Sequence, residues 1–281
     1  MNVTSNVTSE NLRILACQVF IPPTPTVTER NLHLERMVQL VESALQEEPA
    51  DLVVLPELSG IEYSRSSFGN LSELAETLDG PTCQAWKHLA KVYRTTIVFG
   101  MPRTAGSGYC ISQVIAGPDG KLIGHYDKLH LAQYGASMEK EYFSRGDRVM
   151  TFTCKGFRIA PVICYDIRHP ELFRTLALRH NVQLVLHCGA YARDESFHTW
   201  HPFIITRAME NQMFMLSLNR AGENFGHSLF CPPWVDENTT PTEFPEHNEA
   251  LMRFTVDASV ISEVRENYTF LRDRFDDYDA L

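Results

Sequence analysis

The sequence contains no apolar run long enough to cross a membrane, and its seven cysteines include no C-x-x-C pair. A membrane-spanning helix needs about 18 or more consecutive apolar residues. An odd number of scattered cysteines, several of them inside apolar segments, is typical of a reducing compartment. The first ten residues lack the basic and apolar regions of a secretory signal peptide. We therefore expect a cytoplasmic protein that does not associate with membranes, with residues 1–10 forming a disordered N-terminal segment.

An excess of positive charge is also missing, because 35 acidic residues outnumber 25 basic ones and the formal net charge is −10. This balance argues against a general surface for nucleic acids or anionic membranes. No H-x-x-x-H motif or Cys/His ligand set is present, so we expect no metal site. The apolar fraction of 44% and the charged fraction of 21% are those of an ordinary globular protein with a full core.

Strand-like and helix-like segments alternate along nearly the whole chain. Hydrophobic periodicity predicts strands at 12–19, 51–56, 95–100, 109–116, 121–125, 151–154, 157–163, 182–187, 213–218 and 249–256, and helices at 31–45, 81–92, 170–180, 197–211 and 259–266. The turn residues 117–120 and 155–156 indicate two hairpins. No repeat or linker marks a boundary. The sequence therefore predicts one α/β domain with helices on both faces of its sheet or sheets.

Cys164 stands where a short apolar strand ends and a polar turn leads to a helix at Pro170. A residue at such a corner projects from the sheet edge, and the free N–H groups of the new helix point toward whatever it attacks. A thiol there would have a positive helix end that favours the thiolate, and a donor for a developing oxyanion. The alternative is a small buried apolar residue, which is what most free cysteines are. Position alone leaves both interpretations open.

Two charged residues stand beside apolar segments. Glu57 ends a run that we expect to be buried, although a carboxylate there could also cap a helix. Lys128 has apolar neighbours, although it could also be a solvated loop lysine. None of the eleven histidines stands in a context that identifies it as the base for Cys164. The residues alone therefore leave the catalytic base undecided.

Three segments resemble the three signatures of the nitrilase superfamily, the carbon–nitrogen hydrolases with a Glu-Lys-Cys triad. These segments are Leu55-Pro56-Glu57, Tyr126-Asp127-Lys128-Leu129-His130-Leu131, and the stretch 162–172, which closely follows the family pattern C-Y-D-x-R-x-P-E-L. Further matches occur at 139–143 with 146–147, at Trp200 with 207–212, and at 219–222. Thr199, Pro161 and the stretch after Gly226 depart from the family pattern. Because these positions border the pocket, they leave the substrate open.

The resemblance implies a four-layer α-β-β-α sandwich in a single domain at 11–266 and no cofactor. It also implies that residues 267–281 form a C-terminal arm at a subunit interface of a homodimer or higher homo-oligomer. In the implied mechanism Glu57 is the general base and Cys164 the nucleophile. Lys128 and the backbone N–H of Tyr165 hold the oxyanion, and Glu139 orients Lys128.

The sequence Cys164-Tyr165-Asp166 resembles amidase and ω-amidase-like members, whereas true nitrilases typically read C-W-E. We therefore expect a thiol-dependent amidohydrolase that converts a small amide and water to a carboxylate and ammonia. An N-carbamoyl amine or amino-acid hydrolase is the alternative, a nitrilase is less favoured, and a silent assembly module is the non-enzyme alternative. Five residues near the nucleophile or the next strand could contact the substrate or merely serve the fold: Arg168, His187, Tyr191, Arg193 and Trp200.

Overall fold

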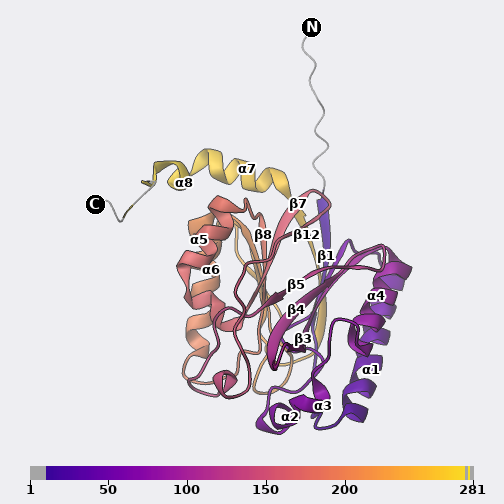
Figure 1. The fold of residues 1–281 in the computed structure, drawn as a ribbon. Coiled ribbons are helices and arrows are strands. Elements are labelled where there is room, and N and C mark those ends of the chain that lie inside the picture. The colour runs from indigo at the N-terminus through magenta and orange to yellow at the C-terminus, as the bar shows by residue number, and fades with distance from the viewer. Residues whose placement is uncertain (1–10, 276–277, 279–281) are drawn as a thin grey trace.

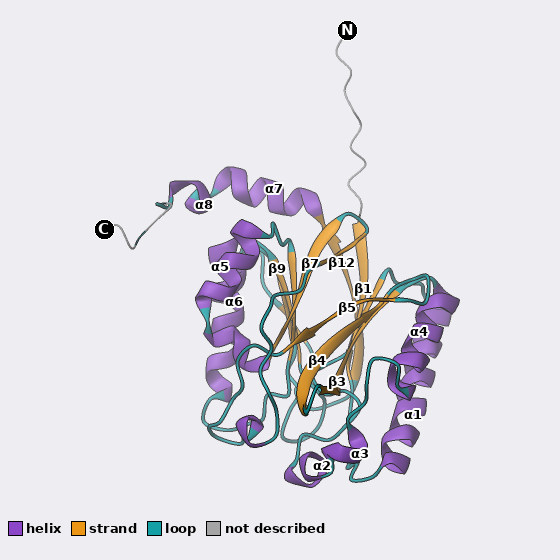
Figure 2. Ribbon diagram, in the orientation of Figure 1, coloured by secondary structure: helices purple, strands orange, loops and turns teal. Residues whose placement is uncertain are grey.

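Two six-stranded sheets lie face to face between two pairs of helices in the computed structural model, which describes residues 11–275 and 278 (Figure 1). Helices α1 (Val27–Glu47) and α4 (Pro81–Tyr93) cover one sheet, and α5 (Pro170–Arg179) and α6 (Trp200–Asn211) cover the other (Figure 2). This arrangement confirms the predicted four-layer sandwich and single domain.

The first sheet has the strand order β12-β1-β2-β3-β4-β5, and the second has the order β11-β10-β9-β8-β7-β6. The strands of the first sheet are β1 (Asn11–Gln18), β2 (Leu52–Val54), β3 (Thr96–Ala105), β4 (Gly108–Ala116), β5 (Leu122–Asp127) and β12 (Ala250–Asp257). Those of the second are β6 (Phe152–Cys154), β7 (Phe157–Ile163), β8 (Leu184–Cys188), β9 (Phe214–Leu218), β10 (Leu229–Cys231) and β11 (Thr242–Glu243).

Alternating side chains divide the core into three apolar layers. Along β1, Leu12 and Ile14 face the space between the sheets, whereas Leu15 packs toward α1 and α4 with Trp86. Along β7, Val162 packs toward α5 and α6. Because the central strands are buried on both faces, they read as continuous apolar runs.

Strands β7, β8 and β9 are parallel and end at the same edge of their sheet. Their last residues are in register, because Ile163 pairs with Cys188 and Cys188 pairs with Leu218. The segments that begin at Cys164, Gly189 and Asn219 therefore leave the sheet side by side. Such an edge is where open parallel sheets commonly place their ligands.

Several elements differ from the sequence prediction. Helix α1 begins four residues before the predicted start at Asn31, because the Glu29 carboxylate accepts hydrogen bonds from N and Oγ1 of Thr26 and caps the helix. The short helices α2 (Arg65–Gly69) and α3 (Leu71–Leu74) were not predicted. Strand β3 also runs beyond its predicted end and forms a long hairpin with β4. The predicted helix at 197–211 begins as a 3₁₀ turn at Phe197–Thr199.

Helices α7 (Ala258–Asn267) and α8 (Phe270–Asp273) follow β12 and extend across one end of the sandwich (Figure 1). Tyr268 stacks on Trp234 with 3.6 Å between ring centroids, so the beginning of the predicted C-terminal arm packs on its own chain. The predicted disordered segment 1–10 lies outside the described residues. Among the helices of the described ranges, none combines the length and apolar character needed to cross a bilayer.

Candidate active site

Lys128 lies between two carboxylates in the interior of the protein. Its Nζ donates hydrogen bonds to Oε1 of Glu57 at 2.7 Å and to Oε1 of Glu139 at 2.6 Å. All three side chains are 0% exposed. An ammonium has three N–H donors, so these two bonds leave one for a further acceptor. Three residues predicted to be catalytic are thus in direct contact.

The remaining carboxylate oxygens are held by the protein. Oε2 of Glu57 accepts from the backbone N–H of Ala190 at 2.8 Å, and Oε2 of Glu139 accepts from that of Ala132 at 2.9 Å. The Tyr63 hydroxyl also donates to Oε1 of Glu139 at 2.9 Å. Glu139 therefore has partners on both oxygens. No motif or pattern in the sequence identifies Tyr63, Ala132 and Ala190 as the donors to these carboxylates.

Two glycines bring the backbone of the acidic and basic segments close to their neighbours. A Cβ added to Gly100 on β3 would lie 2.3 Å from the carbonyl oxygen of Pro56, next to Glu57. A Cβ on Gly146 would lie 2.3 Å from the carbonyl oxygen of Asp127, next to Lys128. Only glycine fits at these two positions, where one backbone segment lies directly against another. They fix where Glu57 and Lys128 leave their strands.

The nucleophile candidate, Cys164, begins the 3₁₀ turn Cys164–Arg168 directly after β7. Its φ of +43° lies in the left-handed region, as does the φ of +46° at Leu58, the residue after Glu57. Such conformations cost about 1–3 kcal/mol for non-glycine residues and cluster at functional sites. Helix α5 begins only at Pro170, so the free N–H groups nearest to Cys164 belong to the 3₁₀ turn. This corrects the expectation that the helix at Pro170 supplies them.

The resting charge of Cys164 differs from the helix-end argument but agrees with a mechanism in which a base acts on a thiol. Burial raises the pKa of its thiol well above the usual value, and the negative charge of Glu57 raises it further. The positive charge of Lys128 lowers this pKa but does not compensate. The side chain is therefore a neutral thiol at neutral pH, rather than a thiolate favoured by a helix end. A base must remove its proton before it can attack.

The pKa of Glu57 suits that task. Burial raises it to about 7, with the Lys128 charge opposing and the Glu139 charge adding to the rise. Burial alone would lower the pKa of Lys128, but the carboxylates of Glu139 and Glu57 raise it well above the usual value. The cluster therefore contains a carboxylate that exchanges its proton near neutral pH beside a permanent ammonium. A base with a pKa near the working pH is the most effective.

Asp166 links the turn Cys164–Arg168 to the segment that carries Lys128. The sequence did not single it out as a site residue. Its Oδ2 accepts from the backbone N–H of Ile163 at 2.9 Å and from the Tyr126 hydroxyl at 2.7 Å. Its Oδ1 accepts from N and Nδ1 of His130 at 3.1 and 2.7 Å. The sequence offered one signal for this link: Asp166 lies two residues after Cys164 in the C-Y-D motif, and its partner His130 lies in the lysine motif.

The five candidate substrate contacts occupy different environments. Arg193 bonds to the carbonyl of Phe225 and to Glu246, so its guanidinium is already engaged by the protein. Arg168 ends the cysteine turn, and its Nε and Nη2 are buried without a hydrogen-bond partner among the described residues. Its guanidinium carbon lies 4.8 Å from the ring centroid of Phe203. Only Arg168 thus has free polar atoms for a ligand.

The other three candidates, His187, Tyr191 and Trp200, are buried and bond to the protein. Both ring nitrogens of His187 have partners, which are the Ser217 hydroxyl and the Cys164 carbonyl. The Tyr191 hydroxyl donates to that same carbonyl at 3.1 Å, and the Tyr191 ring stacks on Trp200. His187 and Tyr191 thus contact the backbone of the nucleophile, and Trp200 supports them through the Tyr191 ring and the Ser217 hydroxyl.

One group of three residues within 11–275 and 278 has side chains of metal-ligand type close together: His201, His227 and Glu243. Its atoms bond to the protein itself, because Nε2 of His201 donates to the His227 carbonyl at 2.7 Å and Nε2 of His227 lies 2.8 Å from Oε2 of Glu243. These bonds explain the grouping without an ion. It contributes nothing to the Glu57, Lys128 and Cys164 cluster.

Comparisons with known proteins find relatives among amidases and in the nitrilase superfamily. The 2-oxoglutaramate amidase of Bacillus subtilis (strain 168) is 34% identical over 227 residues, covering 78% of this chain and 82% of that protein. The omega-amidase NIT2 of Homo sapiens is 27% identical over 245 residues, covering 83% and 86%. The crystal structure of Saccharomyces cerevisiae Nit3, a member of branch 10 of the nitrilase superfamily, superimposes with a TM-score of 0.81 at 25% identity, covering 95% and 97%.

A family model described as carbon-nitrogen hydrolase matches residues 14–266, which is nearly the whole described chain. The match includes all three segments that carry the Glu, Lys and Cys signatures. Together with the sandwich of two sheets, it confirms the family that the sequence motifs predicted. The chain belongs to the carbon–nitrogen hydrolases of the nitrilase superfamily.

Proposed function

We propose that this protein hydrolyses the C–N bond of a small carboxylic amide to a carboxylate and ammonia, through a thioester on Cys164. The single observation that carries the proposal is the buried contact of Lys128 with both Glu57 and Glu139, two carboxylates that act electrostatically on the Cys164 thiol. The similarity to a 2-oxoglutaramate amidase and to an omega-amidase supports an amide as substrate.

In the first half of the reaction Glu57 removes the Cys164 proton as the sulfur attacks the amide carbon. The C=O π electrons move to oxygen, and the oxyanion is held by the third N–H of Lys128 and by the backbone N–H of Tyr165. The intermediate collapses, the C–N bond breaks, and Glu57 gives its proton to the departing nitrogen. Ammonia leaves, and a thioester remains on Cys164.

In the second half Glu57 removes a proton from a water molecule, whose oxygen attacks the thioester carbon. A second oxyanion forms at the same donors. Its collapse breaks the C–S bond, and the sulfur regains a proton from Glu57 as the carboxylic acid is released. Glu139 keeps Lys128 oriented throughout, because its Oε1 binds the ammonium at 2.6 Å and its Oε2 is fixed by Ala132.

We assign Arg168 to a negatively charged group on the substrate. Its Nε and Nη2 are buried and lack an acceptor among the described residues, and buried N–H groups without a partner are costly. A carboxylate would accept both N–H groups in a bidentate pair. The predicted preference is therefore for amides that carry a second carboxylate, and Arg168→Met should abolish it. Equal KM values for matched carboxylated and uncharged amides in the wild type would reject this assignment.

The test of the proposed function is product analysis on a panel of amides, N-carbamoyl compounds and nitriles. Ammonia release from amides, without carbon dioxide, supports the proposal. Carbon dioxide together with ammonia would instead identify the N-carbamoyl hydrolase, and turnover of nitriles alone would identify a nitrilase. Acid quench followed by intact-mass measurement should reveal the acyl adduct in the wild type and none in Cys164→Ala. No turnover and no adduct with any compound would leave the silent assembly module.

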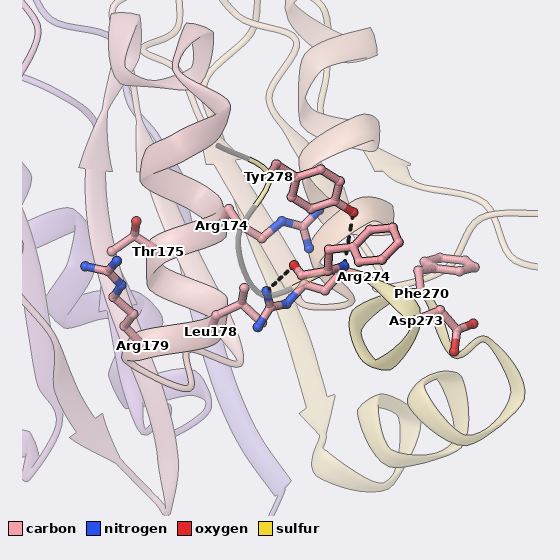
Figure 3. Close-up of a pocket in the computed structure, with 9 residues that line it drawn as sticks. Arg174, Thr175, Leu178, Arg179, Phe270, Asp273, Arg274 and Tyr278 are labelled. Atoms are coloured by element: carbon pink, nitrogen blue, oxygen red, sulfur yellow. Dashed lines mark hydrogen bonds between the residues drawn. The ribbon is translucent and has the colours of Figure 1, made fainter. Parts of the chain in front are cut away.

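We also propose that two copies associate through the face that includes α5 and the C-terminal arm. A cleft of about 940 Å³ separates Arg174 and Leu178 on α5 from the arm (Figure 3). On the arm side Phe270, Phe275 and Tyr278 are 43%, 61% and 62% exposed. Aromatic side chains exposed together mark protein contacts. Sedimentation should give at least a dimer, and Phe275→Asp should shift it to the monomer; a monomeric wild type would refute the proposal.

The cytoplasm is the location that best fits the seven free cysteines. All seven are buried without a disulfide, which is typical of a reducing compartment. Fractionation of cells that express the protein tests this assignment.

A further inference from the structure

The backbone carbonyl of Cys164 receives two hydrogen bonds from buried side chains. Nε2 of His187 donates at 2.8 Å, and the Tyr191 hydroxyl donates at 3.1 Å. Both donors come from the segment that includes the end of β8 and the loop after it. Two donors converging on one carbonyl hold its direction much more firmly than a single one.

His187 is itself oriented by a chain of hydrogen bonds from α6. Nε1 of Trp200 donates to the Ser217 hydroxyl at 2.8 Å, and that hydroxyl lies 2.7 Å from Nδ1 of His187. The indole can only donate, and the Cys164 carbonyl can only accept. Burial lowers the pKa of His187 to about 4, so the ring is neutral at pH 7. Every proton in the chain is therefore fixed: Ser217 donates to Nδ1, and Nε2 carries the hydrogen that reaches Cys164.

The Cys164 carbonyl belongs to the same planar peptide as the N–H of Tyr165. Because the peptide is planar and trans, fixing the direction of the oxygen fixes the opposite direction of the N–H. Hydrogen bonds accepted by a carbonyl also polarise the peptide and strengthen its N–H as a donor. The left-handed φ of +43° at Cys164 is disfavoured for a non-glycine residue, and the two hydrogen bonds to its carbonyl help to hold it.

We propose that His187 is a positioning residue that aims and polarises the Tyr165 N–H, the backbone donor to the oxyanion. Tyr191 shares this role through the same carbonyl, and Ser217 and Trp200 set the His187 tautomer. This inference rests on the proposed function and deepens it. It replaces substrate contact as the role of His187, because both ring nitrogens are already bonded within the protein.

The first test compares two substitutions at His187 by steady-state kinetics on the best amide substrate. His187→Leu removes the donor at similar volume and should lower kcat about tenfold or more, with KM changed less than twofold. The loss in kcat should not exceed the roughly 10²–10³-fold that follows removal of an oxyanion donor itself. His187→Gln keeps an N–H that reaches the Cys164 carbonyl and should retain kcat within about threefold of the wild type. A substrate contact would instead raise KM.

The second test uses an aldehyde analogue of the substrate, which separates positioning from general damage. The Cys164 sulfur adds to the aldehyde carbon, the C=O π electrons become an oxygen lone pair, and the thiol proton passes to Glu57. The oxygen of this adduct occupies the oxyanion site, whereas the carboxylate product makes no covalent bond. His187→Leu should weaken aldehyde inhibition about tenfold and leave inhibition by the product within twofold.

A further variant keeps the proposal falsifiable if His187→Leu does not fold, and a second variant serves as its control. Ser217→Ala frees the His187 tautomer and should lower both kcat and aldehyde affinity at least threefold. Trp86→Phe is the matched control for a buried aromatic residue, because its Nε1 has no hydrogen-bond partner in the described chain and it packs under the other sheet. It should change neither quantity.

The proposal is overturned if a folded His187→Leu, or Ser217→Ala in its place, keeps kcat and aldehyde affinity within twofold. It is also overturned if KM rises while kcat is unchanged. Failure of the proposed function is a different result, because it would appear as a wild type that hydrolyses no amide. Aldehyde addition to Cys164 would still report the orientation of the Tyr165 N–H in that case.

Discussion

Nζ of Lys128 lies 2.7 Å from Oε1 of Glu57, although 71 residues separate them and both side chains are fully buried. Glu139 binds the same ammonium from a third segment. Two carboxylates thus share one cation in the buried interior of the protein. Removing the cation leaves negative charges that cannot be solvated, so Lys128 supports the fold as well as the proposed chemistry.

Lys128→Met should therefore reduce both activity and stability. Loss of an oxyanion donor predicts at least about a hundredfold lower kcat. Breaking a buried ion pair predicts a loss of about 3–5 kcal/mol in the free energy of unfolding. Kinetics and chemical denaturation measure the two effects. Turnover close to that of the wild type would remove Lys128 from the mechanism.

The double variant Lys128→Met with Glu139→Gln separates these effects. Neutralising Glu139 removes one of the two carboxylates left without a cation, so part of the lost stability should return. The missing ammonium is not replaced, so turnover should remain at least about a hundredfold low. If stability does not recover, the charge imbalance is not the cause of the destabilisation.

The pH dependence of kcat/KM should show an acidic limb with a midpoint near 7. Glu57 must be ionised to accept the thiol proton, and burial raises its pKa to about 7. Below that pH the carboxyl is protonated and cannot act as a base, so the rate falls as the pH falls. A profile that stays flat from pH 8 to pH 5 would contradict the assignment of Glu57 as the base.

The sequence predicted the family, the layers and the clustered residues Glu57, Lys128, Glu139 and Cys164, because each lies in a motif or at the end of a strand. From the expected helix end we did not anticipate that burial and the charge of Glu57 raise the pKa of the thiol. The hydrogen bonds of His187 and Tyr191 to the Cys164 carbonyl were also hidden. The His187 ring nitrogen and the Tyr191 hydroxyl both bond to a backbone carbonyl. Every residue has such a carbonyl, so the sequence does not show which one is the partner.

The elements that the sequence did not predict carry little local signal. The helices α2 and α3 have only five and four residues, too few to show helical periodicity. Their positions depend on tertiary packing instead, because Phe68 and Leu71 are buried against Phe143 and other residues of the layer beneath α5 and α6. The start of the 3₁₀ turn at Cys164 depends on Asp166, which holds the Ile163 N–H.

Gly146→Ala should disturb the active site through the backbone alone. The added Cβ would lie 2.3 Å from the Asp127 carbonyl oxygen, while the Gly146 N–H donates to the Lys128 carbonyl at 2.8 Å. Overpacking of this kind costs about 1–3 kcal/mol, and displacement of Lys128 should lower kcat. Gly69→Ala is the matched control, because nothing lies within 4 Å of its added Cβ. Equal melting temperatures for the two variants would contradict this reading of Gly146.

Asp166→Asn should uncouple the cysteine turn from the lysine segment. Asp166 accepts four hydrogen bonds, from the Ile163 N–H, the Tyr126 hydroxyl, and N and Nδ1 of His130. The isosteric amide turns one acceptor atom into a donor that faces other donors. Each buried polar group left without a partner costs about 1–3 kcal/mol. Denaturation should show a loss of at least that size, and kcat should fall because Cys164 and Lys128 are no longer held in register.

The matched control for this change is Asp119→Asn. Asp119 is 61% exposed, and its Oδ1 accepts the backbone N–H of Lys121, a bond that an amide oxygen also makes. Its stability should stay within about 0.5 kcal/mol of the wild type, as is usual for surface substitutions. Asp166→Asn with wild-type stability and turnover would mean that the two segments are aligned by the rest of the core. The stacked rings of His130 and His169, 3.6 Å apart, would then be the next contact to test.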